Sequence, residues 1–80
     1  MRYRLFREVV LKKDIPAKNL KKADVATVVE YHPVSDGEDG YSLEVFNALG
    51  NTIAVITVEE SAIESLTENE VLSVRELAVV

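Results

Sequence analysis

The stretch LKKADVATVVEYHP, residues 20–33, opens with a basic, Leu-led segment, passes through one acid and continues as an apolar run that ends in Pro. The run VATVVEY, residues 25–31, is rich in β-branched residues, which favour strands. Its side chains alternate between two faces, with Ala26, Val28 and Glu30 on one of them. We therefore predict that a strand over residues 25–31 follows a long basic loop.

Four more segments favour strands. YSLEVFN, residues 41–47, alternates cleanly, which predicts a half-buried antiparallel strand with Tyr41, Leu43 and Val45 facing the core. TIAVITV, residues 52–58, is apolar on both faces, so we expect it to be central or covered on its outer side. Shorter strands are expected at residues 6–11 and 63–66.

The connections between these strands define the fold class. SDGEDG, residues 35–40, and ALGN, residues 48–51, read as turns, with Gly50 available for positive φ. In the long connection over residues 12–24 we expect Ile15 and Leu20 to be tucked onto the core. The pattern predicts an all-β fold, a small SH3-like barrel of about five antiparallel strands.

The last residues extend this barrel. Residues 67–80 can form a C-terminal extra strand, which we favour, or a short helix with Thr67 as its cap. The predicted organisation is a barrel over residues 1–66 and a C-terminal extension over residues 67–80 that packs on the barrel or on a partner.

Charge is distributed unevenly along the chain. Residues 1–22 carry eight Lys and Arg against two acids, a balance of +6, whereas residues 23–80 carry one Arg against twelve acids, a balance of −11. Such asymmetry suggests an interaction surface, although bases that pair with acids on neighbouring strands would also explain it. The absence of Cys excludes disulfides and thiolate chemistry. No run is long enough to cross a membrane and no signal peptide is recognisable, so we expect a cytoplasmic protein.

Several motifs resemble a known family. VVLKKDIP, LKKADVATVVE, YSLEVFN and TIAVITV together look like a family of small, mostly cyanobacterial proteins of unknown function, over roughly residues 5–66. The resemblance implies an SH3-like barrel without an assigned activity. It also implies an antitoxin-like role, since some members look like partners of toxin-type proteins encoded beside them. A looser similarity links the same motifs to the KOW segment of ribosomal and transcription-factor barrels.

The chain departs from the family pattern at two positions. Where the family carries glycines, this sequence has Ala23 and Ala26. A left-handed Ala costs about 1 kcal/mol, so we predict an ordinary negative φ at Ala23. The missing glycines also weaken a KOW-type interpretation, because such glycines allow close approach of a nucleic acid to the backbone.

Catalytic and metal sites find little support in the sequence. His32 is the only histidine, and a triad would need an acid and a serine such as Ser35 or Ser42 beside it. We interpret His32 as a solvent-facing residue at the end of a strand. SDGEDG lacks the spacing of a calcium loop. We therefore predict a non-enzymatic protein with no cofactor and no bound metal.

Apolar residues exceed what one five-stranded barrel must bury. Ala54, Ile56 and Val58 share one face of their strand, Phe46 is expected to point outward, and the tail adds Leu72, Val74, Leu77, Val79 and Val80. Such an excess indicates a protein–protein interface. Alternatively, the tail strand covers the outer face of the fourth strand within the same chain.

The sequence thus predicts a protein-interaction module, an antitoxin-like or accessory subunit whose acids steer it onto a basic protein while the tail supplies affinity. A homodimer through the C-terminal segment is also possible. The candidate partner-binding residues are Asp36, Glu38, Asp39, Glu44, Phe46, Glu59, Glu60, Leu72, Val74 and Leu77.

The alternative function is binding of nucleic acid. It would use the basic N-terminal segment, and the candidate residues are Arg2, Arg4, Lys12, Lys13, Lys21 and Lys22. A basic face free of carboxylates would favour this function, and bases interleaved with acids would argue against it.

Overall fold

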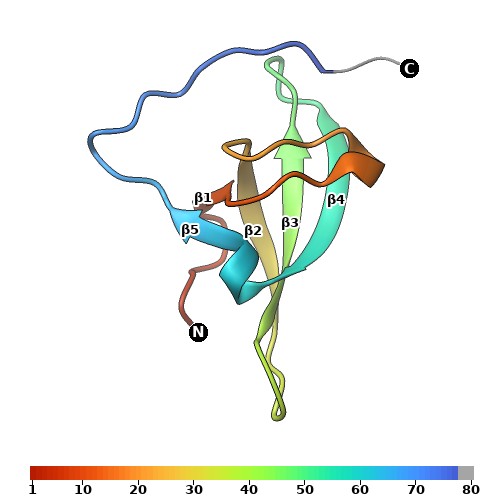
Figure 1. The fold of residues 1–80 in the computed structure, drawn as a ribbon, viewed down its shortest axis with the longest axis vertical. Coiled ribbons are helices and arrows are strands. Elements are labelled where there is room, and N and C mark those ends of the chain that lie inside the picture. The colour runs from red at the N-terminus through yellow and green to blue at the C-terminus, as the bar shows by residue number, and fades with distance from the viewer. Residues whose placement is uncertain (78–80) are drawn as a thin grey trace.

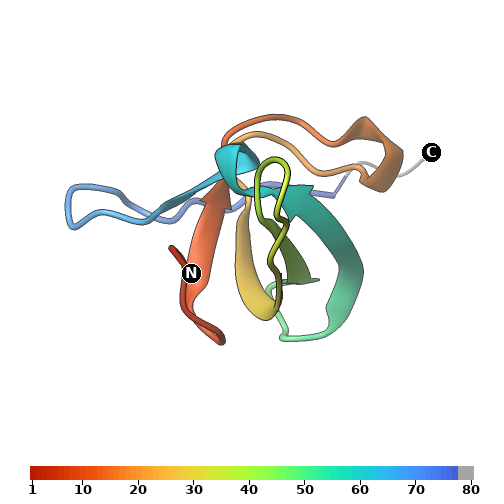
Figure 2. The same cartoon turned by 90° about the horizontal axis from the view of Figure 1, so that it is seen from below.

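The computed structural model describes residues 1–77, which form one antiparallel sheet of five strands with the spatial order β4-β3-β2-β1-β5 (Figure 1). The strands are β1 (Glu8–Leu11), β2 (Val25–His32), β3 (Gly40–Phe46), β4 (Thr52–Glu59) and β5 (Ile63–Ser65). Two short 3-10 helices, η1 (Pro16–Lys18) and η2 (Glu60–Ala62), lie in the connections. The strands curl around a common interior (Figure 2), and the predicted small SH3-like barrel is confirmed. No helix in this part of the chain is long and apolar enough to cross a membrane.

Strand β3, which lies between β4 and β2, provides the middle of the core. Tyr41, Leu43 and Val45 are buried, as their alternation predicts. They pack with Val28 of β2 and Ile56 of β4 in a single cluster. Burying side chains of this size removes apolar surface from water at about 25 cal/mol per Å², which is the main favourable term in folding.

The loop between β1 and β2 closes the side of the barrel that the sheet leaves open (Figure 2). Ile15 and Leu20 form an isolated β-bridge, with Leu20 fully buried and Ile15 packed against the core cluster. The prediction that both side chains are tucked onto the core is therefore confirmed.

The position of β4 corrects the sequence prediction. β4 lies at one edge of the sheet and not in its centre, and its outward-facing Ile53 and Val55 are exposed. Ala54, Ile56 and Val58 face the core and do not form surplus surface. The prediction relied on β4 being apolar on both faces, but an apolar outer face also occurs on an edge strand that nothing covers.

Two chain segments are less regular than predicted. The first strand begins at Glu8 and not at residue 6, because Phe6 has φ 64°, which is incompatible with a strand. The predicted extra strand or short helix at the C-terminus is wrong for residues 67–77, which contain one turn at residues 68–69 and no regular element. Val79 and Val80 lie outside the described residues.

The prediction for Ala23 is wrong. Ala23 has φ 79°, a left-handed conformation that L-residues with a Cβ seldom adopt. Backbone hydrogen bonds hold it there, because the Ala23 N–H donates to the Leu11 carbonyl at 2.8 Å and the Leu11 N–H donates to the Asp24 carbonyl at 2.9 Å. The turn thus keeps the geometry that the resembling family's glycine would allow without strain.

Replacing Ala23 with Gly should raise the free energy of unfolding by about 1 kcal/mol, because Gly avoids the steric cost of a Cβ at positive φ. Urea unfolding followed by circular dichroism measures the change. The matched control is Ala26→Gly, at a buried position in β2, which should lower the free energy of unfolding by about 1 kcal/mol. Destabilisation by both substitutions would contradict the strain assigned to Ala23.

Candidate functional site

Carboxylates gather where the β2–β3 loop meets η2. We call this region the acidic corner, and its members are Glu38, Asp39, Glu59 and Glu60. The Glu60 N–H donates to the Asp39 carbonyl at 2.9 Å, which ties η2 to the end of the loop. Glu38 accepts hydrogen bonds from the Ser61 N–H at 2.7 Å and from the Ser61 hydroxyl at 2.9 Å. Backbone and side-chain hydrogen bonds therefore both join the β2–β3 loop to η2.

Core tyrosines fix the two other well-anchored carboxylates of the corner. The Tyr31 hydroxyl donates to Asp39 at 2.6 Å, and the Val34 N–H donates to the same carboxylate at 2.9 Å. The Tyr41 hydroxyl donates to Glu60 at 3.0 Å. Because the rings of Tyr31 and Tyr41 pack against each other at a centroid distance of 5.3 Å, the rigid core positions both acids.

These contacts favour the ionised acids. The hydroxyl and amide of Ser61 lower the pKa of Glu38, and the hydrogen bond from Tyr31 lowers the pKa of Asp39. The same bond to Asp39 raises the pKa of Tyr31 to about 12. The donors are neutral groups, so the negative charge of the corner stays available to an external cation.

No Lys or Arg within residues 1–77 forms an ion pair in the acidic corner, although Arg2 and Lys12 line a pocket with Glu38 and Glu60, and Lys13 contributes a favourable charge to Glu38. Within residues 1–77, the Asp24–Arg75 ion pair and the approach of Glu30 to the His32 ring at 3.5 Å both lie outside the corner. Of the other candidate acids, Asp36 is exposed in the β2–β3 loop. Glu44 lies on the outer face of β3, where it accepts the Thr52 hydroxyl. The structure thus brings together four of the six predicted acids.

The apolar candidates lie elsewhere. Phe46, at the end of β3, is exposed near the β3–β4 turn, whereas the tail arcs over the end of the molecule opposite the β2–β3 loop (Figure 1). Leu72 and Val74 of the tail are 68% and 95% exposed, and Leu77 is 42% exposed. The predicted partner-binding residues therefore divide into an acidic corner and a separate apolar tail.

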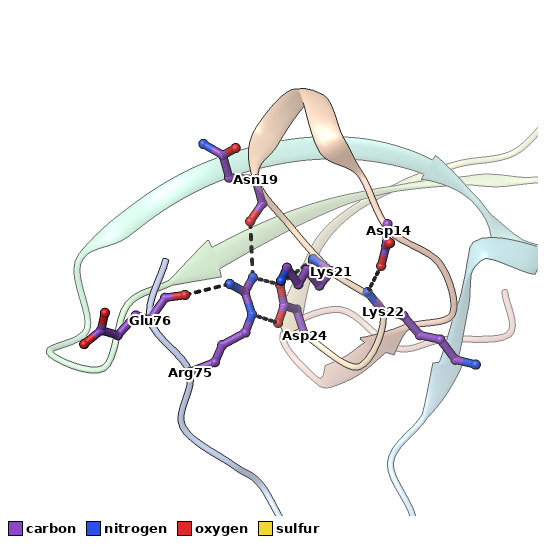
Figure 3. Close-up of polar contacts among 7 residues, drawn as sticks. All are labelled: Asp14, Asn19, Lys21, Lys22, Asp24, Arg75 and Glu76. Atoms are coloured by element: carbon purple, nitrogen blue, oxygen red, sulfur yellow. Dashed lines mark hydrogen bonds and ion pairs between the residues drawn. The ribbon is translucent and has the colours of Figure 1, made fainter. Parts of the chain in front are cut away.

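Arg75 fastens this tail to the body of the protein (Figure 3). Its guanidinium donates to both carboxylate oxygens of Asp24, with 2.9 Å from Nε to Oδ1, and to the Asn19 carbonyl at 3.2 Å. We call this contact the latch. Burial of Asp24 opposes its ionisation, but the hydrogen bonds from Arg75 and from the Lys21 N–H outweigh that cost and lower its pKa.

The latch was not predicted from the sequence, although a signal was present. Arg75 is the only Lys or Arg after residue 22, and Asp24 marks the position where the charge along the chain changes sign. A lone base in an acidic segment can be expected to pair with an acid. The partner, 51 positions away, could not be identified without the fold.

The basic candidates are interleaved with carboxylates. Arg2 and Lys12 line a shallow pocket together with Glu38, Glu60 and Glu64. The Lys22 N–H donates to Asp14, and the Lys21 N–H donates to Asp24, as Figure 3 shows. Lys13 contributes a favourable charge to Glu38, and Arg4 is exposed. These six residues do not form a basic face free of acids.

His32 is more connected than the sequence suggests. Its Nε2 lies 2.7 Å from the Ser42 hydroxyl, which lies 3.0 Å from the Thr57 hydroxyl, so three neighbouring strands are linked on the outer face. Glu30 approaches the same Nε2 at 3.5 Å. In a catalytic triad the acid and the serine contact different ring nitrogens, so this arrangement is not that of a triad. Among residues 1–77 no three His, Cys, Asp or Glu side chains converge as metal ligands.

Comparisons with known proteins give one family match. Residues 5–65 match the family described as Domain of unknown function (DUF4926). No curated protein matches the chain, and no solved structure does.

Substituting Asp39 by Asn should lower the pKa of Tyr31 from about 12 toward its ordinary value of 10.0, because the charged acceptor is removed. Absorbance titration of the tyrosinate measures this change. The control is Asp36→Asn, in the same loop, which should leave the titration unaltered. An unchanged Tyr31 titration in Asp39→Asn would contradict the assigned hydrogen bond.

Acid should weaken the fold through the same carboxylates. The folded-state pKa values of Asp39 and Glu38 lie below their unfolded values, so their contribution is present above the unfolded pKa and is lost as the pH falls through the folded one. We expect the urea midpoint to decrease below about pH 4.5, and to decrease less in Asp39→Asn. A pH-independent midpoint between neutral pH and pH 3 would refute this coupling.

Proposed function

The chain belongs to the DUF4926 family, and we propose that it is a non-enzymatic module that binds another protein, with the acidic corner directed at a basic partner. In this proposal the charged corner governs encounter with the partner and the apolar tail contributes to affinity. The protein carries out no covalent chemistry on its partner.

The observation that carries the proposal is how the acidic corner is held. Hydroxyl and amide donors fix Glu38, Asp39 and Glu60, and no Lys or Arg within residues 1–77 lies within ion-pair distance of them. Such carboxylates are already ordered, and a basic partner does not have to break an ion pair within residues 1–77 to reach them. Less ordering entropy is then lost when the partner binds.

The tail supports the same function independently. Val71, Leu72 and Val74 are largely exposed in a segment that carries no regular structure through residue 77. Contiguous exposed apolar side chains are characteristic of surfaces that other proteins cover. An irregular apolar segment next to a rigid charged body is suited to a partner that makes contacts in two places.

The finer part of the proposal is an antitoxin-like role. It rests on the resemblance of the VVLKKDIP and LKKADVATVVE motifs to a family of mostly cyanobacterial proteins, some of which look like partners of toxin-type proteins encoded beside them. A basic toxin-type protein is the kind of partner that the acidic corner fits. The nucleic-acid alternative gains no support from the interleaved bases, and the His32–Ser42 geometry lends none to an enzyme.

The proposal is tested by recovering the partner with the tagged full chain from its own host and measuring association at increasing salt. The association rate should fall steeply with ionic strength, because steering by exposed charges is screened beyond about 10 Å at 0.1 M salt. Glu38→Gln should lower the rate and weaken its salt dependence.

The matched control for this experiment is Glu68→Gln, which removes the same charge from the tail and leaves the acidic corner intact. It should leave the association rate close to that of the wild type. An association rate that is insensitive to salt, or an equal loss in both variants, would remove the steering role of the corner.

A further inference from the structure

The β2–β3 loop contains two Asp–Gly pairs, Asp36–Gly37 and Asp39–Gly40, so two of the three glycines of the chain directly follow an aspartate. This dipeptide is chemically distinctive, because glycine has no Cβ to shield its backbone nitrogen from the carboxyl group of the preceding residue. The loop projects from the sheet at one end of the molecule (Figure 1). The two pairs share this loop but differ in their surroundings, so each is a reference for the other.

The first pair is unconstrained. Asp36 and Gly37 are both exposed, in the bend at residues 35–37. Within residues 1–77 neither the Asp36 carboxylate nor the Gly37 N–H takes part in a hydrogen bond. Gly37 has φ 143°, and a Cβ built on it would have no neighbour within 4 Å. Exposed loop tips of small and polar residues have the greatest conformational freedom, so the Gly37 nitrogen can approach the Asp36 carboxyl group.

The second pair is held on both of its residues. The Asp39 carboxylate accepts the Tyr31 hydroxyl at 2.6 Å and the Val34 N–H at 2.9 Å. Gly40 is the first residue of β3 and is paired with β2 on one side and with β4 on the other. For the Gly40 nitrogen to reach the Asp39 carboxyl group, these contacts would have to open first.

Ionisation adds to this difference. A carboxyl group that is attacked by an amide nitrogen loses an oxygen as water, and it does so far more readily when it is protonated. The hydrogen bonds from Tyr31 and from the Val34 N–H lower the pKa of Asp39, so the protonated form is rarer than for an ordinary aspartate. Geometry and charge therefore both protect Asp39.

We propose that Asp36 is a site of spontaneous isomerisation to isoaspartate, whereas Asp39 in the same loop is protected. The Gly37 nitrogen attacks Cγ of Asp36, a C–N bond forms, and the carboxyl oxygen leaves as water with the amide proton. The product is a five-membered succinimide ring. Water then adds to one ring carbonyl and breaks its bond to nitrogen. Opening at the former main-chain carbonyl leaves a chain that runs through Cγ, with no net change in mass or oxidation state.

The modification would alter the geometry of the loop and not its charge. Isoaspartate lengthens the main chain by one carbon atom and places the free carboxylate directly on Cα. The altered residue lies two positions before Glu38, which joins the loop to Ser61. The inference does not depend on the proposed function, because the reaction needs only water.

Incubation of the full, folded chain at mildly acidic to neutral pH tests the inference. Digestion followed by electron-transfer fragmentation locates the product, since this method cleaves the Cα–Cβ bond that isoaspartate places in the main chain. Asp36 should convert at a rate close to that in a chain unfolded in guanidinium chloride. In the folded chain Asp39 should convert more than about tenfold more slowly than Asp36, because hydrogen bonds to its charge must open first.

The unfolded chain is the matched control. It keeps both Asp–Gly sequences and removes the contacts that distinguish them, so Asp36 and Asp39 should convert at similar rates there. A second control is Asp36→Glu, which preserves the charge, because the corresponding six-membered ring forms much more slowly. This variant should accumulate no isomerised residue in the folded loop.

Two outcomes would overturn the inference. One is equal conversion of Asp36 and Asp39 in the folded chain, which would show that the contacts of Asp39 give no protection. The other is a folded chain in which neither residue converts while the unfolded chain converts both, which would show that the loop also protects Asp36. A fresh chain that carries no isoaspartate and binds no basic partner would instead count against the proposed function alone.

Discussion

The structure depends on the buried hydroxyl of Tyr41. The residue lies in strand β3 with no exposed surface, so its polar atom must find partners inside the protein. It accepts the N–H groups of Arg2 and Tyr3 at 3.0 and 3.3 Å and donates to Glu60 at 3.0 Å. One oxygen therefore joins the N-terminus, the core and η2.

A second tyrosine extends this network to the other edge of the sheet. The Tyr3 ring packs edge-on against Tyr41 at 5.4 Å, and its hydroxyl donates to the Ile63 carbonyl at the start of β5. β5 has only three residues and, within residues 1–77, pairs with β1 alone, so this bond fixes a strand that would otherwise be marginal. Tyr41 and Tyr31 also hold the carboxylates of Glu60 and Asp39 in the acidic corner, which is why these half-buried acids are ordered.

Local patterns in the sequence predicted local structure well. The alternation in YSLEVFN identified the buried face of β3, and the size of Ile15 and Leu20 showed that their loop must fold back onto the core. The order of strands was harder to predict, since it depends on pairings between distant residues. A β4 that is apolar on both faces has the same sequence signature whether it is central or at an edge.

The candidate site was predicted only in part, because the sequence does not show which distant residues the fold brings together. Glu38, Asp39, Glu59 and Glu60 come from two segments that the fold brings together, and charge alone was enough to select them. The latch and the His32–Ser42–Thr57 chain join residues across strands or across most of the chain. The left-handed Ala23 was missed because propensity favours negative φ, whereas the backbone bonds to Leu11 decide the conformation.

Because of the latch between Arg75 and Asp24, the body of the protein competes with a partner for the Arg75 side chain. A partner that needs the Arg75 side chain must displace its bond to Asp24, and the apparent affinity of that partner falls as the fraction of latched chains rises. A substitution at Asp24, far from the tail in the sequence, would then tighten binding without touching the partner. Asp24, which directly precedes β2, would thus control how readily the tail at the other end of the chain is released.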